Sequence, residues 1–270
     1  MQRVLLLLLL VVSACNPGNK QAKEFSRACD AGDATACHKF ALRLEKGEYV
    51  LRDDARAAGL FDKACASRIG DACGNLGSML QEGRGLKKDS ARALTVFAKG
   101  CDLGGMEACD KLGHFEKSCT GGFMPGCAHF AEVQAQQGKY TEAALLFKRS
   151  CDALVKLGCA GLGKLHAAGT GVTQSDSSAA ALYEKGCEHD QGEGCYPLAI
   201  AYETGKGIPR NYEKAGRLYR EECENRNGEA CARLAMMHES GAGVWQDTAR
   251  ARDYRDQACK AGHKESCKRS

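Results

Sequence analysis

The chain has 270 residues, of which 44% are apolar and 27% charged, and its formal net charge is +4. These values are ordinary for a soluble globular protein, and so small a charge gives no basis for binding nucleic acid or an anionic membrane surface. Two counts are unusual. The 4 prolines suit an all-helical chain, and the 17 cysteines indicate an oxidising compartment, because they would be a liability in a reducing cytosol.

The N-terminus has the pattern of an export signal. Met1–Arg3 is basic, and Val4–Val12 is an apolar run too short to span a bilayer, so residues 1–14 are predicted to be a signal peptide. The sequence Val12-Ser13-Ala14-Cys15 resembles a bacterial lipobox, although the usual pattern has Leu where Val12 stands. The resemblance implies that Cys15 carries a lipid at the mature N-terminus. An ordinary secretory signal followed by an unrelated cysteine is the alternative.

Residues 15–24 are polar and contain a Pro-Gly pair, so we expect a lipidated N-terminus followed by a tether. Asn16 stands where an inner-membrane retention signal has Asp. By the same resemblance, we expect an outer-membrane lipoprotein that faces the periplasm or the cell surface. Residues 25–270 are expected to form the folded part.

The other sixteen cysteines are regularly spaced along the chain. Every pair is C-x7-C, and the first members step by 36, 36, 18, 32, 36, 36 and 36 residues, which indicates a repeat protein. The pairs are Cys29/Cys37, Cys65/Cys73, Cys101/Cys109, Cys119/Cys127, Cys151/Cys159, Cys187/Cys195, Cys223/Cys231 and Cys259/Cys267.

The spacing of eight residues predicts disulfides across turns. Eight residues of a continuous helix rise about 12 Å, whereas a disulfide requires Cα atoms closer than about 7 Å. A turn must therefore separate the two cysteines of a pair, and the intervening residues are rich in Gly, Asp and Asn. Zinc is the alternative, but structural zinc sites favour C-x2-4-C spacing, so no metal is expected.

The segments between the cysteines predict two helices each. A large apolar residue next to a small one, as in Leu76-Gly77, follows the second cysteine and indicates close helix packing. About ten residues beyond the cysteine stands Gly-x-Gly, as in Gly83-Arg84-Gly85, which suits a helix C-cap and a tight turn. A phosphate-binding loop is the alternative reading of Gly-x-Gly, but its recurrence at a fixed phase favours structure. A second helix then runs to the next cysteine.

These segments resemble the Sel1-like repeat, most closely over residues 198–215, and the C-x7-C pairs look like the Hcp-like cysteine-rich branch of that family. The resemblance covers residues 25–270. It implies an all-α fold, an α/α right-handed superhelical solenoid of tetratricopeptide-like helix pairs whose first helices line the concave side.

Two stretches depart from the pattern. The 18-residue step, residues 101–118, is expected to be an irregular half repeat with one helix instead of two. The 32-residue step lacks Gly-x-Gly and has Gln137-Gly138 instead. We expect a kink near residues 107–127, between an arm of about two repeats and an arm of about four.

No catalytic set is recognised. Relatives in the cysteine-rich branch are described as penicillin-binding proteins or β-lactamases, but Ser-x-x-Lys, Ser-Asp-Asn, Lys-Thr-Gly, Gly-x-Ser-x-Gly and His-Glu-x-x-His are absent. His166 and His238 occupy the usual Tyr position of the repeat, so we expect them to be structural. We therefore expect no catalytic residue and no cofactor, with β-lactamase or penicillin-binding activity as the alternative.

The expected function is a monomeric, envelope-anchored, non-enzymatic scaffold that binds a protein, a peptide or a peptidoglycan fragment on its concave face. A purely structural envelope protein is a further alternative. Trp245, the only tryptophan, is either an exposed binding residue or, more often in such turns, packed over the turn. The candidate ligand-binding residues are expected on the first helices, opposite the packed face. The alternative is that this face is an ordinary solvated surface. The candidates are Lys39, Lys111, His114, His129, Lys164 and Arg233.

Overall fold

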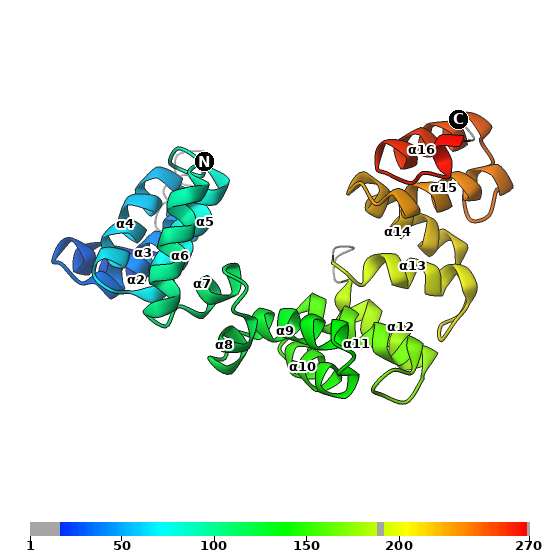
Figure 1. Cartoon of the computed structure of the whole chain (residues 1–270). Coiled ribbons are helices and arrows are strands. Elements are labelled where there is room, and N and C mark those ends of the chain that lie inside the picture. The colour runs from blue at the N-terminus through cyan, green and yellow to red at the C-terminus, as the bar shows by residue number, and fades with distance from the viewer. Residues whose placement is uncertain (1–16, 188–191, 269–270) are drawn as a thin grey trace. The chain divides into compact units, whose positions relative to one another are not determined.

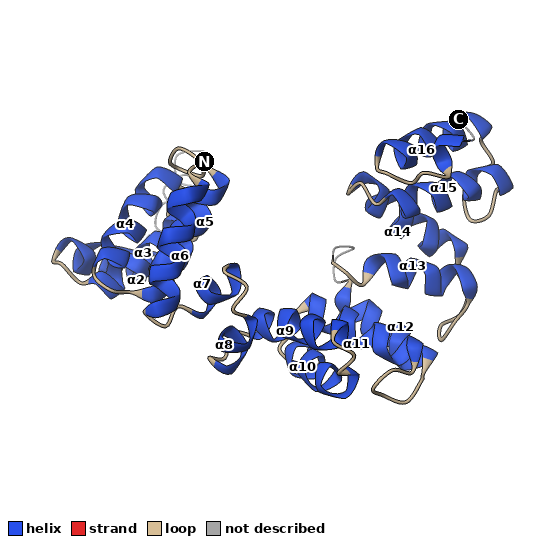
Figure 2. Ribbon diagram, in the orientation of Figure 1, coloured by secondary structure: helices blue, strands red, loops and turns tan. Residues whose placement is uncertain are grey.

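The computed structural model describes residues 17–187 and 192–268, which contain helices and no strand (Figure 2). The chain divides into two compact units, residues 1–126 (unit 1) and 127–270 (unit 2), and each is described by itself. The predicted signal peptide and the predicted lipid-bearing Cys15 lie outside the described residues. The division falls inside the stretch where the sequence predicts an irregularity, and the kink stays a prediction.

After α2 (Pro17–Asp30), the described helices follow one another as seven pairs (Figure 1), so the predicted all-α repeat fold is confirmed. The pairs are α3 (Ala34–Lys46) with α4 (Asp54–Ala66), α5 (Gly70–Glu82) with α6 (Ser90–Asp102), α7 (Met106–Lys111) with α8 (Phe115–Thr120), α9 (Met124–Gln136) with α10 (Tyr140–Asp152), α11 (Lys156–Ala168) with α12 (Asp176–Gly186), α13 (Cys195–Thr204) with α14 (Tyr212–Glu224), and α15 (Gly228–Ser240) with α16 (Thr248–Lys260), followed by the 3-10 turn η2 (Ser266–Lys268).

Local sequence sets the helix ends. Asp53, Asp89 and Asp247 precede second helices of their pairs, and each carboxylate accepts a hydrogen bond from the backbone N–H three residues on. This satisfies a donor that has no partner within the helix. First helices that precede Gly-x-Gly end at its first glycine in the left-handed conformation, as predicted; Gly83 and Gly241 are examples.

The cysteine pairs clip the turn between consecutive helix pairs. In the seven disulfides whose geometry is described, the Cα atoms are 4.5 to 4.9 Å apart and the sequence separation is eight. Cys119 and Cys127 are also disulfide-bonded. The disulfide prediction is confirmed. The seven described bridges are Cys29–Cys37, Cys65–Cys73, Cys101–Cys109, Cys151–Cys159, Cys187–Cys195, Cys223–Cys231 and Cys259–Cys267.

The second cysteine of a pair lies inside the core rather than at an accessible site, except for Cys267, which is exposed. Cys37 in α3 and Cys73 in α5 are 0% exposed, and Cys159 in α11 is 1% exposed. The first turn of the helix faces the neighbouring helices, so its cysteine also fills core volume. These residues are therefore structural, and they offer no surface to a ligand or to a redox partner.

Seven of the clipped turns have a residue with positive φ at the same place. It stands three residues after the first cysteine, where the chain reverses before the next helix begins. Glycine adopts this conformation without a steric cost, whereas other residues pay about 1–2 kcal/mol. In the described turns the residue is Gly32, Arg68, Gly104, Gly122, Leu154, Arg226 or Gly262.

The second glycine of Gly-x-Gly touches the preceding repeat. A Cβ added at Gly85 would overlap the backbone of Asp54, the first residue of α4. Gly207 approaches the backbone of Asp176 at the start of α12 in the same way. Glycine is required here by close backbone approach as well as by its positive φ.

The first repeat makes the same contact with the roles exchanged. Tyr49 occupies the position of Gly85, with φ 62°, and its ring lies where a Cβ on Gly18 would be. Gly18 belongs to α2, which begins at Pro17, so residues 17–24 are helical where the sequence predicted a tether. The prediction missed the helix because Pro-Gly was read as a breaker, whereas proline at the first helical position is favourable.

The large–small pairs pack as predicted. Gly77 lies under the ring of Phe97, and Gly163 lies under the ring of Tyr183, so that a Cβ at either glycine would clash with the aromatic ring. Phe97 is 2% exposed and Tyr183 is 7% exposed. Each aromatic side chain of a second helix is therefore seated directly on the backbone of its own first helix.

The prediction of one helix over residues 101–118 is wrong. Two six-residue helices, α7 and α8, replace the usual pair of 13-residue helices. Gly113, with φ 79°, ends α7 and permits the reversal into α8. The stretch is therefore a miniature helix pair with its own turn.

Substituting glycines in unit 1 tests the repeat contact. We expect Gly85→Ala to lower the free energy of unfolding by about 3 kcal/mol, because it adds overpacking against Asp54 to left-handed strain. Gly104→Ala is the matched control, because its Cβ would meet nothing within 4 Å, and we expect a loss of only about 1 kcal/mol. Equal losses in urea denaturation of the two variants would contradict the contact.

Candidate functional site

The predicted ligand-binding residues do not form one site. Lys39, Lys111 and His114 belong to unit 1, whereas His129, Lys164 and Arg233 belong to unit 2. Lys39, Lys111, His114 and Lys164 are exposed, and the other two are half-buried. Lys39 lies over the ring of Phe25 at 5.6 Å.

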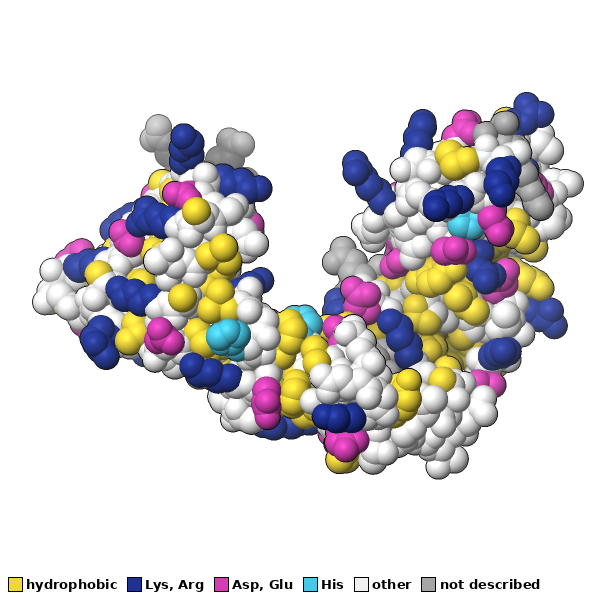
Figure 3. Space-filling model, viewed as in Figure 1, with side chains coloured by type: hydrophobic (Ala, Val, Ile, Leu, Met, Phe, Trp, Pro, Cys, Tyr) yellow, Lys and Arg dark blue, Asp and Glu magenta, His cyan; other side chains and the backbone are white. Residues whose placement is uncertain are grey.

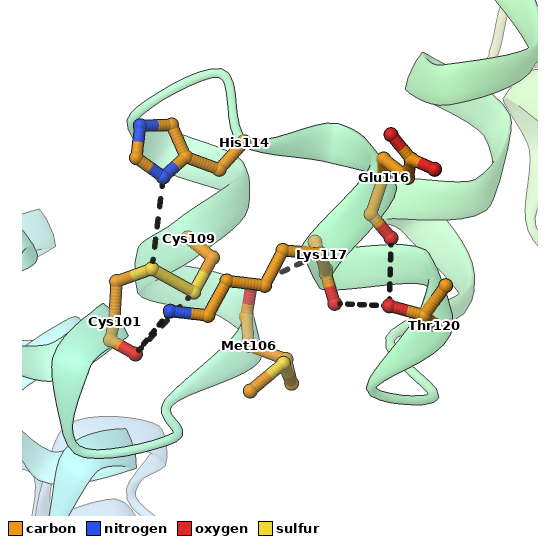
Figure 4. The surroundings of a disulfide bond; sticks show 8 residues. Cys101, Met106, Cys109, His114, Glu116, Lys117 and Thr120 are labelled. Carbon is orange, nitrogen blue, oxygen red and sulfur yellow. Dashed lines mark hydrogen bonds between the residues drawn. A yellow bond between two sulfur atoms is a disulfide. The ribbon is translucent and has the colours of Figure 1, made fainter.

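The surroundings of His114 are occupied by structural contacts (Figure 4). His114 Nδ1 lies 4.0 Å from Cys101 Sγ, and Lys117 Nζ donates a hydrogen bond of 3.2 Å to the carbonyl oxygen of Cys101. Lys63 makes the corresponding contact with the carbonyl of Cys29 at 3.1 Å in a regular repeat. The polar side chains of the short pair thus follow the repeat rule, with a lysine satisfying a helix-terminal carbonyl.

Arg233 is held by a partly buried polar cluster. Its Nη1 lies 2.7 Å from Glu203 Oε2, and its Nε donates to the hydroxyl of Tyr196 at 3.3 Å. The hydroxyl of Tyr219, whose side chain is fully buried, donates to the same Glu203 oxygen at 2.6 Å. Arg233 therefore links α15 to α13, and its charge is balanced within the protein.

Burial opposes the charge of Arg233, but Tyr196, Tyr219 and Glu203 outweigh it, so the pKa of Arg233 lies above its ordinary value. Burial, followed by the hydrogen bond to Glu203, raises the pKa of Tyr219. With these shifts, Tyr219 stays a neutral phenol and Arg233 stays a guanidinium paired with the carboxylate of Glu203.

A recess in unit 2 lies on the second-helix face, where α14 and α16 are neighbours in the stack. This groove has a volume of about 490 Å³. Lys and Arg side chains stand out over these helices in Figure 3. The groove is lined by Asn211, Glu213, Lys214, Arg217, Arg220, His238, Gly243, Val244, Trp245 and Arg250.

The helical period of α14 builds one wall of the groove. Lys214, Arg217 and Arg220 are spaced three residues apart, so they follow one another along the helix surface, and all three are exposed. With Arg250, they give four cationic side chains against the single carboxylate of Glu213, a formal charge of +3. Lys214 also lies over the ring of Tyr202 at 5.0 Å.

Trp245 stands at the edge of the groove and is 92% exposed. Its backbone is fixed: its carbonyl oxygen is 3.0 Å from Nδ1 of His238, and the next hydrogen bond runs from Asp247 N–H to the carbonyl of His238. The reading that Trp245 packs over its turn is wrong, because the turn is closed by the histidine and leaves the indole outside.

His238 has the predicted structural role. It is 2% exposed, its ring stacks on Tyr254 with centroids 5.4 Å apart, and a carbonyl oxygen is the partner of Nδ1, so Nδ1 carries the proton. His166 has the same arrangement with the carbonyl of Thr173. The Nε2 atom of His238 is buried and has no hydrogen-bond partner among the described residues.

A Ser–His–Glu set lies near the C-terminus. Ser266 Oγ is 2.8 Å from His263 Nδ1, and His263 Nε2 is 3.6 Å from Glu229 Oε1. The backbone N–H of Ser266 also donates to Nδ1, and Ser266 is 5% exposed. The histidine therefore caps the η2 turn, and a buried hydroxyl in this position is poorly placed to attack a substrate.

No group of three or more His, Cys, Asp or Glu side chains within residues 17–187 and 192–268 is arranged to hold a metal ion. Among the helices described, none is both long and apolar enough to cross a membrane.

The sequence analysis did not predict the groove, because it expected the ligand-binding residues on the first helices of the pairs. The signal was present: a cation at every third residue of a helix predicts a basic stripe. What the sequence of one repeat does not show is that this stripe lies beside a loop of the following repeat that carries Trp245.

Comparison with known proteins identifies the repeat. The Sel1 repeat matches residues 34–67, 70–105, 156–191, 192–224 and 228–263. No curated protein sequence matches the chain.

Among solved structures, a Sel1 repeat protein from Oxalobacter formigenes is 18% identical with a TM-score of 0.62, over 92% of this chain and 78% of that one. A protective antigen of uropathogenic Escherichia coli, displaying an SLR fold, is 23% identical with a TM-score of 0.60, over 90% of this chain. This chain spans 57% of that antigen. Cysteine-rich protein B of Helicobacter pylori is 22% identical with a TM-score of 0.37, over 53% of this chain and 96% of that one. The first two likenesses show a shared fold.

Tyr219→Phe tests the partly buried polar cluster through its pH dependence. Tyr219 keeps its proton in the folded chain at pH values where the unfolded chain loses it, near pH 10. Stability is therefore unaffected below about pH 10 and falls above it, by about 1.4 kcal/mol per pH unit for this one proton. We expect the parent chain to lose stability relative to Tyr219→Phe as the pH rises from about 10 to about 11.

Urea denaturation at a series of pH values measures this difference. Tyr140→Phe is the control, because Tyr140 is 41% exposed. A stability difference between the parent chain and Tyr219→Phe that stays constant with pH would contradict the assignment.

Proposed function

The chain belongs to the Sel1 repeat family, and from this premise we propose that it is a non-enzymatic, envelope-anchored scaffold that binds an acidic polypeptide segment of another protein in the groove of unit 2. Sel1 repeats form scaffolds suited to protein–protein interaction. The proposal moves the binding surface from the first helices, where the sequence favoured it, to the face of α14 and α16.

The groove's composition supports this assignment. An exposed tryptophan next to several arginines has the composition of an interaction hot spot, in which Trp and Arg are enriched. Arg217, Arg220 and Arg250 suit carboxylates, to which a guanidinium donates paired hydrogen bonds. A ligand with successive acidic side chains and an apolar residue for the indole matches the groove in both respects.

The disulfides support binding with little ordering cost. Cys223–Cys231 joins α14 to α15, and Cys259–Cys267 closes the turn after α16, so both walls of the groove are cross-linked to their neighbours. A site that is rigid before binding loses less conformational entropy when a partner is bound.

The anchor rests on the N-terminal sequence and on the cysteines. All cysteines of the described residues are in disulfides, which indicates an oxidising compartment. Cys15 is the one of the 17 cysteines that lies outside the eight pairs, and it directly follows Val12-Ser13-Ala14. We propose acylation of this residue, an outer-membrane location and a monomeric state.

Two substitutions test the groove. We expect Trp245→Ala to weaken binding of a fluorescent poly-glutamate peptide by about 30-fold, the effect of removing a hot-spot aromatic of about 2 kcal/mol. Arg220→Ala should also weaken it, and the affinity of the parent chain should fall with added salt. Fluorescence anisotropy measures all three.

Arg252→Ala is the matched control, because Arg252 is exposed on α16 but does not line the groove. Equal losses for Arg220→Ala and Arg252→Ala would contradict a specific site. If the groove binds muropeptides and not the acidic peptide, the ligand is a cell-wall fragment and the proposed polypeptide ligand is wrong. Turnover of nitrocefin that Ser266→Ala abolishes would overturn the non-enzymatic assignment.

The anchor is tested separately. We expect Cys15→Ser to leave the chain unacylated, so that it is released into the soluble fraction or remains unprocessed. Fractionation of cells and the intact mass of the mature protein measure the outcome. A chain that stays in the membrane fraction at an unchanged mass would contradict lipidation at Cys15.

A further inference from the structure

The loop between α3 and α4, residues 47–52, carries an unusual side chain at its tip. Leu51 is 91% exposed, and Tyr49 in the same loop is 50% exposed. The tip is the fourth residue after the glycine that ends the first helix, here Gly47. A large apolar side chain in water at this position does not contribute to the packing of the repeat.

The other repeats show that folding does not require an apolar residue at the tip. The equivalent position, four residues after the capping glycine, holds Lys87, Thr173 and Pro209 in three repeats of the same geometry. In the last repeat it holds Trp245, which lines the groove. Leu51 therefore has a role that the repeat itself does not explain.

The position of the loop along the chain suggests that role. The ring of Tyr49 lies on Gly18 in the first turn of α2. Gly18 is three residues from Cys15, and three residues of extended chain span at most about 11 Å. Leu51 follows Tyr49 by two residues. A lipid on Cys15 therefore brings the tip of this loop to the bilayer surface.

We propose that the 47–52 loop contacts the membrane, with Leu51 inserted among the lipids and Tyr49 at the headgroup level, and that this contact orients unit 1 on the bilayer. The inference rests on the proposed anchor at Cys15. Aromatic rings favour the interface, and burial of Leu51 in the bilayer removes its exposed surface from water.

Charge contributes little to this contact. Arg52 is paired with Asp54 through two hydrogen bonds, of 2.8 and 3.0 Å, and Arg43 and Lys46 both face Glu48. The loop is therefore close to neutral, and the contact is expected to be similar on neutral and anionic bilayers.

The experiment uses the mature chain beginning at Cys15, coupled through that thiol to a maleimide lipid in phosphatidylcholine vesicles. Chemical coupling takes the place of acylation, so the result does not depend on whether cells acylate Cys15. Trp245→Phe provides a background without tryptophan, and Leu51→Trp adds the reporter. The last repeat has Trp at the same tip position, so this substitution suits the loop.

We expect the tryptophan at position 51 to shift its emission to the blue on vesicles, to be quenched by brominated acyl chains and to be protected from iodide. Leu94→Trp in the same background is the matched control, because Leu94 is 59% exposed on α6, in the next helix pair of unit 1. Its emission should stay as it is in solution.

Equal access of iodide to position 51 on vesicles and in solution would overturn the proposal. Equal quenching of positions 51 and 94 by brominated lipid would also overturn it, because no particular loop would then face the bilayer. Insertion that occurs only when anionic lipid is added would replace the apolar contact by an electrostatic one. Failure of the anchor itself is seen in the mass of the Cys15→Ser chain.

Discussion

The structure depends on one local constraint, the clipped reversal between consecutive helix pairs. A second helix ends just after one cysteine, a residue with positive φ turns the chain, and the next cysteine opens a first helix only 4.5 to 4.9 Å away at Cα. The disulfide thus holds together two helix ends that the turn has already brought into contact. Because the loop closes over eight residues, the cost in chain entropy is small and the pairing is decided locally. Every regular repeat inherits its orientation from this joint, and even the miniature pair α7 and α8 keeps it at Cys101–Cys109.

The second constraint acts between repeats and has a different origin. Where a first helix is followed by Gly-x-Gly, the loop lies on the backbone that begins the preceding second helix, as Gly85 does on Asp54. No disulfide holds this contact, and it depends only on the absence of a side chain on one of the two surfaces. In the first repeat the residue without a side chain is on the helix instead of the loop, because Gly18 on the helix makes room for Tyr49 on the loop. The requirement is therefore for space at the contact rather than for glycine at one fixed position.

What could be predicted from the sequence follows from these two constraints. The helix order, the caps and the cysteine pairing depend on neighbours within a few residues, so the 36-residue spacing of the cysteines and Gly-x-Gly predict them correctly. The helical start at Pro17 and the two short helices around Gly113 were missed, because a Pro-Gly pair and a short segment are each compatible with more than one local structure. The groove was missed for another reason. Lys214, Arg217 and Arg220 are separated from Trp245 by a whole helix, and only stacking makes their surfaces neighbours.

The loop tips connect the repeat architecture to function. A tip side chain takes part in neither the clipped reversal nor the loop–backbone contact, so neither of them restricts its chemistry. Lys87, Thr173 and Pro209 illustrate this freedom, because three chemically unlike residues occupy one position without changing the cap geometry beside it. A large apolar residue at such a tip costs solubility and contributes nothing to the core, so its presence calls for a contact outside the repeat. Leu51 and Trp245 are the two tips of this kind among the described Gly-capped loops, and each lies beside a feature that supplies such a contact: the N-terminal segment leading from Cys15 in unit 1, and the basic groove in unit 2.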